Sequence, residues 1–276
     1  MVTFSAHDGT LLTYHRVGET PPLVCVPGGP MRSSSYLGDL GGLPSLALLD
    51  LRGTGGSAEP TDPATYRCDH LVDDVEALRA GLGLERIDLL GHSAGAAVVV
   101  LYAARYPDRV GRLVLVTPSP RVVGVDITDA DRRELAELRR DEPWFPEAFA
   151  AFERIWAGDP TDADWAGIAP FFHGRWDDET QATEAAGATE TNETAALGYY
   201  SEGALDPDAT RAALVGLTAP VLLLAGEYDV ALPPGRAAEY AGLFPNAELV
   251  VQPASGHYPY LDDRVSFATT VGDFLG

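Results

Sequence analysis

Short apolar runs alternate with helical patterns along the first 118 residues. Strand-like apolar runs occupy residues 11–17, 23–26, 45–50, 86–90 and 112–116. These runs lack the regular polar and apolar alternation of a half-exposed strand, so they predict strands buried on both faces of a parallel sheet. Between them, residues 69–80 and 94–106 carry apolar side chains at helical spacing. Such alternation is typical of the α/β class.

The pattern changes at residues 119–206 and then returns. Helix-like, acidic pieces occupy 128–141, 146–157 and 177–194 without strands between them. From residue 207 onward we expect a helix, a strand at 220–225, a helix after Pro234, a strand at 248–251 and a last helix from Tyr260. The sequence therefore predicts one core domain, formed by residues 1–118 and 207–276, with a helical cap, or lid, domain at 119–206 inserted into it.

The composition is that of a soluble globular chain, with 276 residues, 46% hydrophobic and 22% charged. The formal net charge of −22 would repel nucleic acid and an anionic membrane. All 19 basic residues are arginines and the chain contains no lysine. Enzymes that need a lysine amine are therefore excluded: Schiff-base aldolases, pyridoxal phosphate enzymes, Walker A ATPases and ordinary protein kinases.

The predicted cap concentrates both charge and aromatic residues. It holds twenty acidic residues against seven arginines, all four tryptophans and five of the nine phenylalanines. The aromatic side chains either supply the cap's own core or line an apolar ligand pocket. The acidic residues either form a solvated face or bind a cationic group. We expect His70 and His173 to be structural or exposed.

Cys25 and Cys68 are too few for a disulfide framework or a zinc site. The first residues lack the basic and apolar regions of a signal peptide, and no apolar run reaches the ~18 residues of a membrane span. We therefore expect a cytoplasmic protein that binds no metal or cofactor and no membrane.

The first candidate for chemistry is the segment Gly91-His92-Ser93-Ala94-Gly95, a G-x-S-x-G pattern between a predicted strand and a predicted helix. A serine nucleophile must stand clear of the sheet on a tight strand-to-helix turn, and small flanking residues permit that turn. The start of the following helix also contributes a favourable dipole. This context makes Ser93 the candidate nucleophile.

An acid and a base follow in the order that this chemistry uses. Asp229 lies just past the strand at 220–225, and His257 lies past the strand at 248–251. Sites in α/β sheets form at such carboxyl ends. We expect His257 to accept the proton of Ser93 and Asp229 to orient the imidazole. Glu227 is an alternative acid.

An acyl-transfer site also needs donors for the oxyanion. Pro27-Gly28-Gly29-Pro30 follows the strand at 23–26, and glycines there let a backbone N–H approach the substrate oxygen. We expect the N–H groups of Gly29 and Ala94 to form this oxyanion hole.

Taken together, these motifs resemble the α/β-hydrolase superfamily over nearly the whole chain. Two stretches resemble the proline iminopeptidase family of serine aminopeptidases. Residues 27–31, Pro-Gly-Gly-Pro-Met, match that family's His-Gly-Gly-Pro-Gly, and residues 50–57 match its Asp-x-Arg-Gly-x-Gly-x-Ser. The resemblance implies an α/β-hydrolase fold with a mostly parallel central sheet and a helical cap, no metal, and cleavage of an N-terminal proline or similar residue.

The chain departs from this family at three places. Pro27 and Met31 replace the outer residues of the first motif, and His92 and Ala94 flank the serine where the family has Gly and Trp. The family's cap carries Glu-Asn-His-Tyr-Phe, whose Glu binds the substrate amine. Aligning its end with residues 198–200 places Ala196 at that Glu. The candidate substrate-binding residues are therefore the nearby Glu190, Glu193 and Glu202, together with Tyr199.

The sequence predicts a serine hydrolase that cleaves a small ester or amide and resembles proline iminopeptidase. Its partner would be a small-molecule or short-peptide substrate. One alternative is a small-molecule esterase, lactonase or thioesterase of a biosynthetic pathway. An alternative from another class is a ligand-binding protein of the same fold without turnover. The sequence predicts no oligomeric state.

Overall fold

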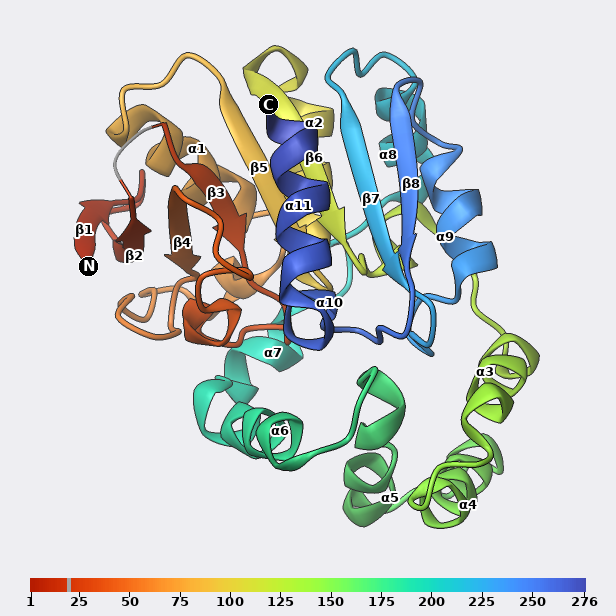
Figure 1. Ribbon diagram of the computed structural model, residues 1–276. Helices are drawn as coiled ribbons and strands as arrows, with labels where there is room; N and C mark the ends of the chain where they lie inside the picture. The colour runs from red at the N-terminus through yellow and green to blue at the C-terminus, as the bar shows by residue number, and fades with distance from the viewer. Residues whose placement is uncertain (19–20) are drawn as a thin grey trace.

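The computed structural model describes residues 1–18 and 21–276, which form one eight-stranded sheet with helices on both faces (Figure 1). The strand order is β1-β2-β4-β3-β5-β6-β7-β8. The strands are β1 (Val2–Ser5), β2 (Leu11–Val17), β3 (Leu23–Val26), β4 (Leu46–Asp50), β5 (Ile87–His92), β6 (Val110–Val116), β7 (Val221–Gly226) and β8 (Ala247–Gln252). β1 pairs antiparallel with β2, and β2 pairs antiparallel with β4. The six strands in the order β4-β3-β5-β6-β7-β8 are parallel to one another. The mostly parallel α/β sheet is thereby confirmed.

The seven predicted strands correspond to β2–β8, and β1 was not predicted. β1 is a short edge strand with little buried surface, so it lacks the apolar run that marks the central strands. In the centre, successive residues face opposite sides of the sheet, as strand geometry requires. Val24 and Val26 pack on one side, and Leu23 and Cys25 pack on the other.

Two layers of helices cover these faces. The face that carries Val24 is covered by α1 (Leu71–Gly81), α2 (Gly95–Arg105), α8 (Pro207–Leu214) and α9 (Pro234–Ala241). The other face is covered by α10 (Pro259–Asp262) and α11 (Arg264–Leu275), with Phe267 and Val271 buried against the strands. Because both faces are covered, the central strands read as continuous apolar runs in the sequence.

A group of helices lies beyond one end of the sheet (Figure 1). It comprises α3 (Asp129–Ala136), α4 (Phe145–Trp156), α5 (Asp162–Gly167), α6 (Asp178–Glu190) and α7 (Glu193–Tyr199). The short α5 was not predicted, and the expected helical stretch at 177–194 is divided. Thr191 has extended backbone, and the Asn192 side chain accepts from the N–H of Ala195 to start α7.

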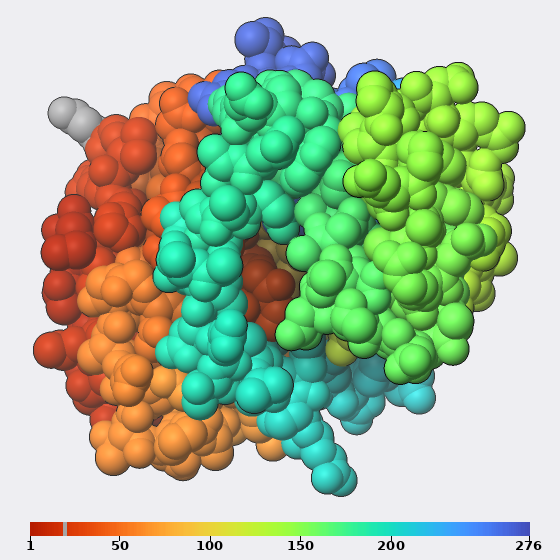
Figure 2. All heavy atoms as spheres, turned by 90° about the horizontal axis from the view of Figure 1, so that it is seen from below, coloured from red at the N-terminus to blue at the C-terminus, as the bar shows by residue number. Residues whose placement is uncertain are grey.

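These helices have a small apolar core of their own. Phe152 stacks on Trp156 with ring centroids 4.9 Å apart, and Phe171 packs against Trp144 at 5.0 Å. Seen from below, a hollow opens between the arm of α6 and α7 and the arm of α4 and α5 (Figure 2). Among the described residues, no helix has the length and apolar character needed to cross a membrane.

Candidate active site

Ser93 stands on a sharp turn between β5 and α2. Its φ is 51°, in the left-handed region that non-glycine residues rarely adopt. The two flanking glycines permit this turn by close packing. A Cβ at Gly91 would lie 2.5 Å from Val99 Cγ2, and one at Gly95 would lie 2.4 Å from the Pro27 oxygen. The turn therefore holds a strained residue at the end of the sheet, a feature that concentrates at functional sites.

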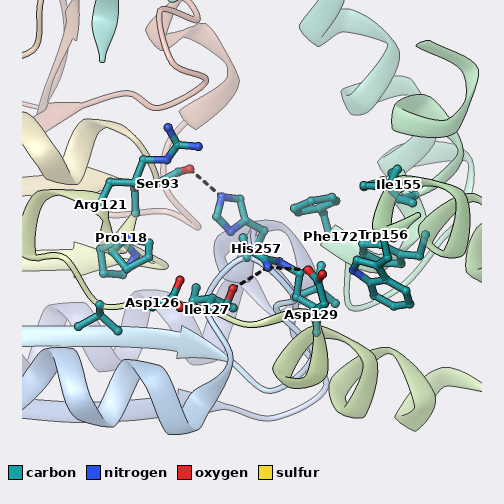
Figure 3. A pocket seen from close by; sticks show the side chains of 18 of the residues that line it. Ser93, Pro118, Arg121, Asp126, Ile127, Asp129, Ile155, Trp156, Phe172 and His257 are labelled. Carbon is teal, nitrogen blue, oxygen red and sulfur yellow. Dashed lines mark hydrogen bonds and ion pairs between the residues drawn. The ribbon is translucent and has the colours of Figure 1, made fainter. Parts of the chain in front are cut away.

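The structure brings the three predicted residues into one hydrogen-bonded chain. Ser93 Oγ lies 2.8 Å from His257 Nε2 (Figure 3). His257 Nδ1 lies 2.9 Å from Asp229 Oδ2. Asp229 is fully buried, and its Oδ1 accepts from the N–H of Ala231 at 2.9 Å. With Asp229 ionised, Nδ1 carries the proton and Nε2 is free to accept one from the serine.

The alternative acid, Glu227, does not reach the histidine. Its Oε2 accepts from the backbone N–H of Ala254 at 2.7 Å, at the outer side of the loop. The loops that carry the acid and the base cross very closely instead. A Cβ at Gly226 would lie 2.0 Å from the Gly256 oxygen, and the His257 N–H donates to the Phe172 oxygen at 2.7 Å. This packing fixes the imidazole relative to Asp229.

The glycine loop after β3 packs directly on the serine turn. A Cβ at Gly28 would lie 2.8 Å from Ser93 Cβ and 3.3 Å from the Ala94 nitrogen. The Gly28 N–H already donates to Tyr36 Oη at 2.6 Å. The N–H groups of Gly29 and Ala94 have no acceptor within residues 1–18 and 21–276. Both N–H groups are therefore free of a protein acceptor there, and their role as oxyanion donors stays a prediction.

Two chambers meet at Ser93 and His257. The first, of about 590 Å³, lies under α3–α5 and is here called the apolar chamber (Figure 3). Its wall consists of Phe152, Ile155, Trp156, Trp165, Ile168 and Val230. Polar groups, among them Arg121 and Asp126, line it as well. It suits an apolar chain or ring with a polar edge.

The second, of about 630 Å³, lies under α6 and is here called the charged chamber. Small residues form much of its wall, namely Ala166, Ala169, Ala185, Gly187 and Ala188. Arg32 and Glu184 supply its charges, and Tyr36 and Tyr258 line it as well. Phe172 and Ala231 border both chambers.

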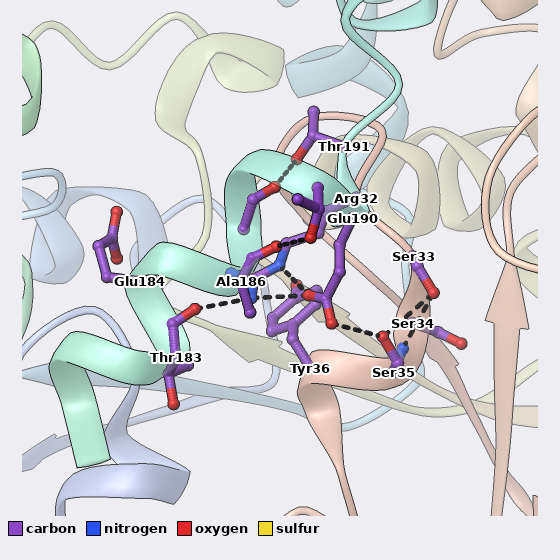
Figure 4. Close-up of polar contacts among 12 residues, drawn as sticks. Arg32, Ser33, Ser34, Ser35, Tyr36, Thr183, Glu184, Ala186, Glu190 and Thr191 are labelled. Carbon is purple, nitrogen blue, oxygen red and sulfur yellow. Dashed lines mark hydrogen bonds and ion pairs between the residues drawn. The ribbon is translucent and has the colours of Figure 1, made fainter. Parts of the chain in front are cut away.

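The charges in the second chamber are held by specific partners. Arg32 Nε and Nη2 both reach Glu190 Oε2 at 2.8 Å, and Nη2 donates to the Thr183 oxygen at 3.1 Å (Figure 4). Glu184 Oε2 lies 3.2 Å from His173 Nε2. This hydrogen bond lowers the pKa of the Glu184 carboxyl, so that residue is anionic at neutral pH.

The four cap residues predicted to bind substrate lie elsewhere. Glu190 is occupied by Arg32 and by Ser35 Oγ, and Glu193 and Glu202 are exposed to solvent. Tyr199 is fully buried and donates to the Ala94 oxygen at 2.8 Å, so it supports the serine turn. None of these described residues lines either chamber. Spacing along the sequence failed here because tertiary contacts, such as the Arg32 pair with Glu190, set which acidic side chains of the cap face the chambers.

Two chamber residues were not predicted from the sequence, Arg32 and Glu184. Arg32 is 6% exposed and lies two residues after Pro30. A single arginine next to the glycine motif could have marked it in the sequence as a candidate site residue. Glu184 is one acid among many in α6 and carries no distinguishing signal. Within the described ranges, no group of three His, Cys, Asp or Glu side chains is placed to hold a metal ion.

The chain matches the model of the alpha/beta hydrolase fold over residues 21–264. It belongs to this family. It is 28% identical to 2-hydroxymuconate semialdehyde hydrolase of Pseudomonas sp. (strain CF600), over 82% of this chain and 74% of that one. It is 27% identical to the proline iminopeptidase of Heyndrickxia coagulans, over 94% and 91% of the two chains. The esterase of Exiguobacterium antarcticum superposes with a TM-score of 0.75 at 20% identity, over 99% of this alpha/beta hydrolase and 98% of that chain. The resemblance to proline iminopeptidases is thus confirmed at the level of the family.

Proposed function

We propose that this alpha/beta hydrolase cleaves a small ester or amide with Ser93 as the nucleophile. Ser93 Oγ attacks the carbonyl carbon while its proton passes to His257 Nε2. The N–H groups of Gly29 and Ala94 stabilise the negative oxygen that forms. His257 then gives the proton to the leaving group. Water, deprotonated by the same imidazole, attacks the acyl-enzyme and releases the acid with Ser93 restored.

The observation that carries this proposal is the unbroken chain from Ser93 through His257 to a fully buried Asp229, with distances of 2.8 and 2.9 Å. A structural role alone does not explain a serine at a φ of 51° whose hydroxyl faces two chambers. A ligand-binding protein without turnover needs neither feature.

The two chambers support a substrate with unlike halves. A proline iminopeptidase-like activity requires an anionic group for the substrate's free amine, and Glu184 provides one in the chamber that Ser93 also lines. The alternative is an ester, lactone or thioester without an amine. The aromatic wall of the apolar chamber favours an apolar acyl or ring group in both cases. The names of the similar proteins include a proline iminopeptidase and an esterase.

The test compares labelling and turnover in the same preparations. A fluorophosphonate probe should label the wild-type protein and not Ser93→Ala, while Ser201→Ala, changed in an exposed loop outside both chambers, should label normally. Proline p-nitroanilide is then compared with p-nitrophenyl acetate and butyrate. Turnover of the amide identifies an aminopeptidase, and turnover of the esters alone removes that assignment. Absence of both labelling and turnover in the wild-type protein contradicts the hydrolase proposal.

A further inference from the structure

A hydrogen-bonded relay connects the glycine loop, the serine turn and the histidine loop. The Gly28 N–H donates to Tyr36 Oη at 2.6 Å. Tyr36 Oη lies 2.7 Å from His92 Nδ1, and His92 Nε2 lies 2.9 Å from the backbone oxygen of His257. Gly28, Tyr36 and His92, none of them the nucleophile, the base or the acid, are therefore linked behind the site to the backbone of the base, His257.

The chemistry of these groups fixes the direction of every bond in the relay. An N–H only donates, so Tyr36 Oη accepts from Gly28 and has one proton left to give to His92 Nδ1. A carbonyl only accepts, so His92 Nε2 must carry the proton that bonds to the His257 oxygen. His92 is thus a neutral imidazole in one tautomer. Burial supports this state because it holds the pKa of His92 well below its usual range.

The relay determines which N–H groups can stabilise an oxyanion. Because Tyr36 takes the Gly28 N–H, the next free donor is that of Gly29. The Gly28 peptide is also pressed against the turn, since its Cβ position is 2.8 Å from Ser93 Cβ. A shift of the loop by a few tenths of an ångström would move Gly29 relative to the serine, and oxyanion stabilisation depends on such placement.

We infer that Tyr36 is a positioning residue that acts through Gly28 and His92 to hold the oxyanion donor and the base at their working distances. This inference rests on the proposed hydrolase activity. Tyr36 lines the charged chamber, but its hydroxyl is engaged by Gly28 and His92, so the hydroxyl acts on the transition state through these two residues. Its ring also lies 4.4 Å below the Arg32 guanidinium, so the ring itself must be kept in any test.

Tyr36→Phe removes only the hydroxyl, and Tyr260→Phe is its matched control. The two rings lie 5.6 and 5.5 Å from the His92 ring. Tyr260 Oη is buried but has no hydrogen-bond partner in the described part of the chain. With p-nitrophenyl acetate, we expect Tyr36→Phe to lower kcat about tenfold and to change KM by less than about twofold. This loss of kcat is smaller than the loss caused by deleting an oxyanion donor outright, because the donor is displaced rather than removed. Tyr260→Phe should keep both constants.

A sulfur substrate separates positioning from general disruption. In a thionoester, sulfur replaces the carbonyl oxygen and accepts hydrogen bonds poorly, so a misplaced oxyanion donor matters less. The kcat loss of Tyr36→Phe should therefore be several-fold smaller on the thionoester than on the ester. His92→Phe keeps an aromatic ring, breaks the same relay and should show the same signature if Tyr36→Phe does not fold.

The outcomes distinguish the two proposals. An equal loss on ester and thionoester, an unchanged kcat, or an equal loss in Tyr260→Phe overturns the positioning role of Tyr36. A wild-type protein that neither turns over the ester nor reacts with a fluorophosphonate overturns the hydrolase proposal itself.

Discussion

The two sides of the site are built in different ways. On the sheet side, the buried carboxylate of Asp229 is 0% exposed, and backbone loops hold each group through close packing. On the side of α3–α7, the carboxylate of Glu184 is 41% exposed, and within the described part of the chain one hydrogen bond, to His173, holds it. Because the backbone on the sheet side is closely packed, a substitution there displaces several groups of the site together. On the helical side, one side chain can be replaced without moving its neighbours.

This difference assigns separate tasks to the two sides. Changes on the sheet side should lower kcat for every substrate, because they disturb groups that act in the transition state. Changes on the helical side should alter which substrates are preferred, because they act on groups that touch the parts of the substrate away from the reacting carbonyl. Each substitution below tests this division.

The largest effect is expected at the buried acid. Asp229→Asn keeps the shape of the side chain but no longer holds the proton on His257 Nδ1, so kcat should fall by about 10³- to 10⁴-fold. Glu227→Gln is the control, since among the residues that the structure describes the Glu227 carboxylate bonds only to the Ala254 N–H. The measurement is kcat for p-nitrophenyl acetate and for proline p-nitroanilide. Equal losses of kcat in the two variants would show that Asp229 is not the acid that orients His257.

The next effect is expected at the glycine loop. A Cβ at Gly28 would lie 2.8 Å from both Ser93 Cβ and the His92 oxygen, which forces the loop away from the serine. Gly28→Ala should lower kcat by about 10²-fold on ester and amide alike. Gly272→Ala in α11, where a Cβ meets no atom within 4 Å, should leave kcat unchanged. A Gly28→Ala protein that keeps its full rate on one substrate class contradicts the division.

These sheet-side residues were also the ones that the sequence predicted. Ser93 and Asp229 follow the buried strands β5 and β7, whose apolar runs are visible in the sequence because both faces of the sheet are covered, and His257 follows the half-buried edge strand β8. The ends of neighbouring parallel strands must meet at one edge, so the order of the strands brings distant residues together.

The helical side offered no comparable rule. Glu190 and Glu184 belong to the same helix, yet one pairs with Arg32 and the other faces the chamber. Polar helices such as α6 have no strong apolar face that sets their rotation. Their orientation depends on tertiary contacts, such as the Arg32 bonds to Glu190 and Thr183, that no local pattern encodes.

A smaller and substrate-dependent effect is expected at Glu184. Glu184→Gln removes the negative charge from the charged chamber, so kcat/KM for proline p-nitroanilide should fall about tenfold, the scale of one partly exposed charge-assisted bond. The value for p-nitrophenyl acetate should change by less than about twofold, since that ester carries no amine. Glu193→Gln, exposed on α7, is the matched control. Equal losses on both substrates would place Glu184 with the groups that act in the transition state.

The smallest effect is expected at Trp156, where an aromatic wall rather than a charge is removed. Trp156 stacks on Phe152 and lines the apolar chamber, so Trp156→Ala withdraws contact surface from any group lodged there. The ratio of kcat/KM for p-nitrophenyl butyrate to that for acetate should fall about threefold, because the two extra methylenes lose part of their burial. Trp144 packs on Phe171 and lines neither of the two chambers described, so Trp144→Ala should lower the melting temperature and keep the ratio. The assignment is contradicted if Trp156→Ala leaves this ratio unchanged and a substitution in the charged chamber changes it instead. The butyryl chain would then lie in the charged chamber, and the leaving group would lie in the apolar chamber on the other side of Ser93.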